Sequence, residues 1–135
     1  MADRNAVSEL FATYGWASDT RDPDLVGQVL ADDPTFGITI AGERTVGPLH
    51  GRDEIVQFFA DVFQTQSDQR RHVITNFRYL DETDDTAHVR AHLSLLITDG
   101  GVLTAKCTGV YDTHLVRVGD AWRFASIDLA LDSAF

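Results

Sequence analysis

The feature that most constrains the fold is a run of long alternating segments that fills the second half of the chain. Four segments in which apolar and polar residues alternate follow one another, at 71–80, 86–98, 102–117 and 121–131. Such alternation is typical of β-strands that bury one face. Short clusters rich in Asp and Gly indicate hairpin turns between them, at 81–85, 99–101 and 118–120. The sequence therefore predicts a long antiparallel meander.

The part of the chain before the meander is predicted to be mostly helical. Apolar residues recur at helical spacing over about residues 3–18, 22–30 and 53–65. Residues 35–40 and 44–49 are predicted to be two strands joined by a turn. Helices followed by a long meander favour an α+β fold. We expect three helices on the concave face of a curled, mainly antiparallel sheet of about six strands, with a pocket between the layers.

Length and charge restrict the possible functions. A chain of 135 residues is predicted to form one domain, over residues 1–135. Its formal net charge of −10 argues against a nucleic-acid or anionic-membrane partner, because phosphate binding depends on Lys and Arg. No apolar run approaches ~20 residues, and the first residues lack a signal peptide, so we expect a cytoplasmic protein. The single Cys107 excludes an intrachain disulfide and a paired-cysteine zinc site.

Short motifs along the chain resemble those of one superfamily. Residues 14–22 (YGWASDTRD) resemble the end of the first helix of SnoaL-like, nuclear-transport-factor-2-like (NTF2-like) proteins. Other matching segments are 47–51 with 53–55, 71–76 (RHVITN), 109–111 and 121–123. The resemblance covers nearly the whole chain and implies a cone-shaped NTF2-like fold with an enclosed apolar pocket. It does not imply one reaction, because this superfamily includes dehydratases, dehydrochlorinases, isomerases, cyclases and non-catalytic subunits.

A subset of that superfamily suggests three catalytic residues. Members similar to bile-acid dehydratase and hexachlorocyclohexane dehydrochlorinase place an Asp after the first helix and a His on the third strand, and the dehydratase-like members add a Tyr. The matching positions here are Asp19, His72 and Tyr14. The resemblance implies that His72 removes a C–H proton while Asp19 orients its ring and stabilises the imidazolium. Tyr14 would donate a hydrogen bond to a carbonyl or leaving oxygen.

Each of these three residues also has a purely structural interpretation. Tyr14 falls on the apolar stripe of the first predicted helix and suits a core position. Asp19 suits a cap in the turn that ends at Asp22. His72 suits a structural hydrogen-bonding role.

Four further residues are predicted to bind substrate. Tyr111 and Thr113 share the parity of Cys107 on their strand and are expected to line the pocket. Asn76 shares the parity of His72, and Trp122 lies on the last strand.

No metal or cofactor is expected. His88 and His92 fall on the polar face of their strand, without a nearby third ligand. Asp112 and His114 have the opposite parity to Tyr111 and are expected to be exposed.

These observations predict a cofactor-independent lyase, a dehydratase acting on a hydrophobic hydroxylated small molecule of steroid, terpenoid or polyketide type. Two alternatives stay open: a cyclase or isomerase that uses the same residues, and a non-catalytic ligand-binding or oxygenase accessory subunit. The resemblance and the second face of the meander also predict a homo-oligomer, a trimer or a dimer.

Overall fold

The computed structural model of the protein describes residues 1–134 as three helices and six strands. The helices are α1 (Arg4–Thr20), α2 (Pro23–Gln28) and α3 (Arg52–Gln64). The strands are β1 (Leu30–Ile40), β2 (Glu43–His50), β3 (Gln69–Glu82), β4 (Thr86–Asp99), β5 (Val102–Val118) and β6 (Ala121–Leu131). None of the helices in this part of the chain is long and apolar enough to cross a membrane.

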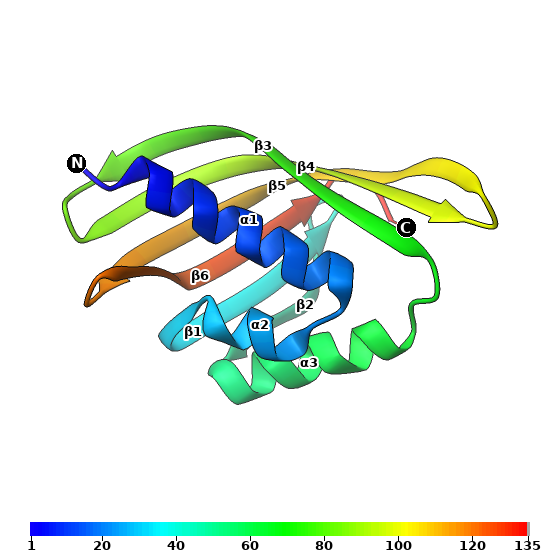
Figure 1. Ribbon diagram of the computed structural model, residues 1–135, viewed down its shortest axis with the longest axis horizontal. Coiled ribbons are helices and arrows are strands. Elements are labelled where there is room, and N and C mark those ends of the chain that lie inside the picture. The colour runs from blue at the N-terminus through cyan, green and yellow to red at the C-terminus, as the bar shows by residue number, and fades with distance from the viewer. Residues whose placement is uncertain (135) are drawn as a thin grey trace.

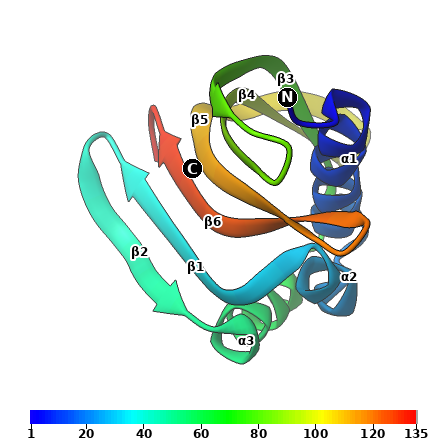
Figure 2. The same ribbon diagram turned by 90° about the vertical axis from the view of Figure 1, so that its left-hand side faces the viewer.

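All six strands form one sheet in the order β2-β1-β6-β5-β4-β3. Every neighbouring pair is antiparallel except β1 and β6, which are parallel. The sheet curls without closing, and the helices lie on its concave side (Figures 1 and 2). This confirms the predicted α+β architecture of three helices on a curled, mainly antiparallel six-stranded sheet.

Two aspartates set where the first two helices begin. The Asp3 carboxylate accepts a hydrogen bond from the Ala6 backbone N–H (3.0 Å), and the Asp22 carboxylate accepts one from Leu25 N–H (3.1 Å). Between the helices, Arg21 adopts a left-handed backbone conformation (φ 55°) that ends α1. The turn between α1 and α2 is therefore very short, which fixes the start of α2 close to the end of α1.

The core lies between the concave face and the helices, and strand parity places side chains in it. On β5 the inward positions are buried as predicted: Cys107, Gly109, Tyr111, Thr113 and Leu115. Aromatic rings from α1, α3 and the sheet meet in edge-to-face contacts, for example Phe11 with Phe124 (5.1 Å between centroids) and Phe36 with Phe59 (5.1 Å). These contacts join the helical layer to the sheet.

The second helix and the first strand differ from the prediction. Helix α2 ends at Gln28, and Leu30 already belongs to β1. The pairing of β1 with β6 shifts register between Leu30 and Thr35, and Asp33 has a positive φ of 53° within this stretch. Pro34 follows there, where its missing N–H costs no ladder hydrogen bond. The apolar residues assigned to a helix therefore begin a strand that an irregularity interrupts.

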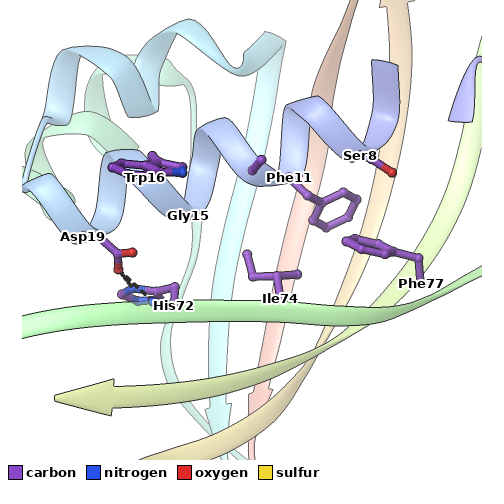
Figure 3. Close-up of a pocket in the computed structure, with 9 residues that line it drawn as sticks. Ser8, Phe11, Gly15, Trp16, Asp19, His72, Ile74 and Phe77 are labelled. Carbon is purple, nitrogen blue, oxygen red and sulfur yellow. Dashed lines mark hydrogen bonds and ion pairs between the residues drawn. The ribbon is translucent and has the colours of Figure 1, made fainter. Parts of the chain in front are cut away.

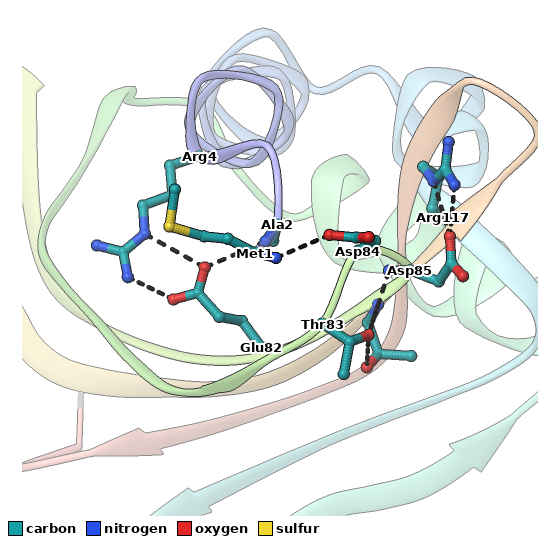
Figure 4. A network of polar contacts seen from close by, with 9 residues as sticks. Met1, Ala2, Arg4, Glu82, Thr83, Asp84, Asp85 and Arg117 are labelled. Carbon is teal, nitrogen blue, oxygen red and sulfur yellow. Dashed lines mark hydrogen bonds and ion pairs between the residues drawn. The ribbon is translucent and has the colours of Figure 1, made fainter.

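The start of α1 is tied to the β3–β4 hairpin by ion pairs (Figure 4). The Arg4 guanidinium pairs with the Glu82 carboxylate, which also accepts a hydrogen bond from Ala2 N–H (3.1 Å). The hydrogen bond from Arg4 lowers the pKa of the Glu82 carboxyl group. The Met1 amine lies 2.8 Å from Asp84 Oδ1. These contacts hold one end of α1 along β3, and the candidate site lies at the other end.

Candidate active site

Asp19 and His72 meet where the end of α1 lies beside β3 (Figure 3). His72 Nδ1 lies 2.6 Å from Asp19 Oδ1, and the His72 backbone N–H donates to the same oxygen at 2.8 Å. Both side chains are mostly buried, with 14% of His72 and 12% of Asp19 exposed. The predicted contact between these two residues is therefore present, and the backbone bond fixes the position of the carboxylate.

The structure does not use Asp19 as a helix cap. Asp22 caps α2, and Arg21 donates to the Asp68 backbone carbonyl (2.7 Å) rather than to Asp19. Asp19 instead lies in the last turn of α1, where the negative end of the helix dipole disfavours a carboxylate. Its hydrogen bonds to His72 offset that cost. An acid at an unfavourable helix end that is held against a histidine indicates a role beyond ending the helix.

The Asp19 contact also selects the histidine tautomer. An ionised carboxylate only accepts hydrogen bonds, so Nδ1 of His72 carries the proton and donates to Asp19. In the neutral ring, Nε2 then holds the lone pair. This is the state that a general base requires.

An apolar cavity of about 320 Å³ lies between the sheet, α1 and α3, and His72 lines it. Most of the lining is aliphatic and aromatic: Phe36, Ile38, Ile40, Val46, Phe58, Phe59, Val62, Phe63, Leu93, Leu95, Leu129 and Leu131. His72 also lines a second hollow of about 330 Å³ between α1 and β3, together with Asp19 and Trp16 (Figure 3). The histidine therefore stands between an interior cavity and an outer groove.

Tyr14 and Tyr111 contribute two neighbouring phenols to the cavity wall. Their rings meet edge to face, with centroids 5.8 Å apart, and both side chains are buried. Burial raises the pKa of Tyr14, and a side-chain hydrogen bond with Tyr111 partly opposes this rise. Burial and the neighbouring Tyr14 raise the pKa of Tyr111 well above its usual value. Both phenols thus stay protonated. One O–H serves the hydrogen bond between them, and the other can donate to a bound molecule.

Several further polar residues of the cavity were missed from the sequence, among them Gln66 and Arg70. Gln66 follows α3, and its Oε1 is buried without a hydrogen-bond partner within residues 1–134. Arg70 lies two residues before His72 on β3, and its Nε donates to Asp68 Oδ1 at 2.8 Å. This hydrogen bond lowers the pKa of the Asp68 carboxyl group. The parity that Arg70 shares with His72 was a usable signal for it, whereas nothing in the local sequence marks Gln66.

The structure places three of the predicted substrate-binding residues away from the cavity. Asn76 is exposed, because β3 has a bulge between Thr75 and Arg78 and Asn76 takes a φ of 57° there, which breaks its parity with His72. Thr113 is fully buried and donates to the Val89 carbonyl at 2.7 Å. Trp122 is buried at the far end of β6, where it pairs with Arg117 and borders outer hollows. These three residues therefore do not line the cavity, and only Tyr111 of the four does.

Comparison with protein families shows to which family this chain belongs. The family model described as the SnoaL-like domain matches residues 1–128. The chain belongs to the SnoaL-like family. Comparison with curated proteins gives no match.

Solved structures place this SnoaL-like protein in the NTF2-like fold. Three similar solved structures are of proteins from Novosphingobium aromaticivorans. An NTF2-like protein with a cystatin-like fold is 21% identical with a TM-score of 0.81, over 96% of this chain and 81% of that one. A proposed aromatic ring hydroxylase is 27% identical (TM-score 0.75, 98% and 90% covered). A proposed scytalone dehydratase is 16% identical (TM-score 0.77, 96% and 83% covered). At these identities the likenesses to the first and third establish the fold alone.

Proposed function

We propose that the protein is a cofactor-independent dehydratase that acts on a hydrophobic hydroxylated small molecule in the apolar cavity. The observation that carries this proposal is the 2.6 Å contact between His72 Nδ1 and Asp19 Oδ1 beside that cavity. The SnoaL-like family and the structural similarity to a proposed scytalone dehydratase support a lyase. The cavity walls support an apolar substrate skeleton, because few polar groups line them.

The side chains of the site can carry each proton transfer that a dehydration requires. Nε2 of His72 removes a proton from a carbon next to a carbonyl group, and Asp19 stabilises the imidazolium that forms. The hydroxyl of Tyr14, or of Tyr111 beside it, donates a hydrogen bond to the developing enolate oxygen. The C–O bond between the next carbon and its hydroxyl group then breaks. The departing hydroxide takes the proton from the imidazolium, so that water leaves and His72 returns to its neutral state.

The same residues also suit a cyclase or isomerase, in which the enolate attacks a second carbon or is reprotonated instead of losing hydroxide. A non-catalytic role as an oxygenase subunit is the third candidate, and the structural similarity to the beta subunit of a proposed aromatic-ring-hydroxylating dioxygenase favours it. A subunit of that kind needs no base at its cavity. The pairing of His72 with a carboxylate therefore favours an enzyme.

The dyad is tested by replacing its members one at a time. We expect His72→Ala to fold and to lose activity by on the order of 10²–10⁴-fold. Asp19→Asn should cost activity as well, because an amide cannot stabilise a charged imidazole. Turnover is measured by mass spectrometry as loss of water from a panel of hydrophobic β-hydroxy carbonyl compounds.

His92→Ala is the matched control, because His92 is an exposed histidine of the same sheet outside the cavity. It should keep full activity. Saturable ligand binding with no turnover, unchanged by His72→Ala, would instead support the accessory-subunit candidate.

A further inference from the structure

A second cluster of ionisable side chains lies on the opposite face of the sheet from the cavity. His88 on β4 and His114 on β5 are a direct cross-strand pair, and Asp112 precedes His114 by two residues on β5. The alternating neighbours Val89 and Thr113 are completely buried on the concave side. His88, Asp112 and His114 therefore project together from the convex side.

The three side chains are already in contact. His88 Nε2 lies 2.6 Å from Asp112 Oδ1, and the rings of His88 and His114 stack with centroids 4.2 Å apart and 15° between their planes. One ligand atom from each of the three residues lies within 4.8 Å of the others. Within residues 1–134 no other group of His, Cys, Asp or Glu side chains is arranged in this way.

We propose that His88, Asp112 and His114 bind a divalent transition-metal ion, with Zn²⁺ as the preferred ion. Two imidazoles and one carboxylate are a ligand set that suits zinc, and a fourth position stays open to water. Bond lengths of zinc to nitrogen and oxygen place ligand atoms about 3.4 Å apart in a tetrahedral site. The ligand atoms lie no more than 4.8 Å apart here, so binding requires only a small change in their spacing.

The environment is compatible with a cation. Arg90 is the competing positive group, with its Nε 3.8 Å from Asp112 Oδ2. About half of the Arg90 side chain is exposed, so it can turn toward solvent when an ion occupies the carboxylate. The sequence alone missed this cluster, because the alternation pairs His88 with His92 on one strand. The third ligand comes from β5 across the sheet.

The position of the cluster indicates what a bound ion would do. It joins β4 to β5 on the convex face, whereas His72 lies on the concave side. The ion would therefore stabilise the sheet and take no part in the chemistry at His72. Its open coordination position points outward, where a side chain of a second copy of the protein can reach it.

The test is calorimetric titration of Zn²⁺ into the full chain after treatment with a chelator. We expect one saturable site per chain in the unaltered protein. His114→Ala and Asp112→Asn should each weaken binding by at least about tenfold. Zn²⁺ should raise the Tm of the unaltered protein and leave that of His114→Ala unchanged. His114 is exposed, so this variant should fold, and circular dichroism verifies it.

Two control variants make the proposal falsifiable. His92→Ala removes an exposed histidine of β4 outside the cluster, and His72→Ala removes the candidate base; both should bind Zn²⁺ like the unaltered protein. The proposal is overturned if no saturable binding occurs, or if His92→Ala weakens binding as much as His114→Ala. Loss of binding in His72→Ala alone would move the metal to the cavity and overturn it as well.

Discussion

Among single side chains, the buried phenols Tyr14 and Tyr111 make the clearest pH prediction. Burial raises the pKa of both above the ordinary phenol value of 10.0. Above that pH the unfolded chain loses these protons while the folded chain keeps them, so the free energy of unfolding falls as pH rises. The contribution of each phenol to this slope should rise through pH 10 toward a limit of about 1.4 kcal/mol per pH unit.

Urea unfolding at steps between about pH 9 and about pH 11 measures this slope. Tyr111→Phe should make this slope shallower, since only one of the two fully buried phenols remains. An unchanged slope in that variant would mean that Tyr111 ionises in the folded state as it does in solution.

The individual residues of the site differ in how well the sequence alone predicts their positions. The motifs around Asp19 and His72 mark both residues, and the structure brings them into contact. Asn76 is misplaced because alternation assumes a regular strand, and the bulge at this position is not visible in the pattern. Gln66 reaches the cavity only because α3 ends beside the curled sheet, which is a property of the tertiary arrangement.

The strands and helices differ in how much added volume they accept, and two glycines illustrate this. A Cβ at Gly109 on β5 would lie 2.7 Å from the Ala130 backbone carbonyl oxygen of β6. Gly109→Ala should therefore lower the free energy of unfolding by about 1–3 kcal/mol, because the two backbones must separate. Denaturant unfolding measures the change.

Gly15→Ala is the matched substitution in α1. Its Cβ would meet no atom nearer than 3.6 Å, which is ordinary contact. Alanine favours a helix over glycine by about 1 kcal/mol, so this variant should be more stable than the unaltered protein. Equal destabilisation by both substitutions would refute the close approach of β5 to β6.

The order of elements was predictable because long alternating strands and amphipathic helices each carry a periodic signal. The meander, the three helices and the buried side of β5 all follow from it. The start of β1 was not predictable in this way. Its first residues, Leu30 and Ala31, continue the apolar run of α2, and only pairing with β6 decides that they are extended.

The complete protein is predicted to be a homo-oligomer, a dimer or a trimer that uses the convex face of the sheet. Val110 lies on that face, between His92 and Ala130 of the neighbouring strands. Light scattering should give a mass above the 14.9 kDa of one chain. Val110→Lys should shift the mass toward the monomer, because the interface would then bury a charge. A clean monomer of the unaltered protein at working concentration would contradict the prediction.

The lone thiol of the chain lies in the cavity wall, and this makes the cavity accessible to a simple kinetic experiment. Cys107 is buried there, and burial raises the pKa of its thiol, so its reaction with thiol reagents should be slow. Because no other cysteine is present, the rate at which a small apolar disulfide reagent modifies the protein reports how often the cavity admits a molecule. A compound that occupies the cavity should slow that modification in proportion to its occupancy. Screening for such protection identifies ligands before any reaction product is known, and the Cys107→Ser variant gives the background rate.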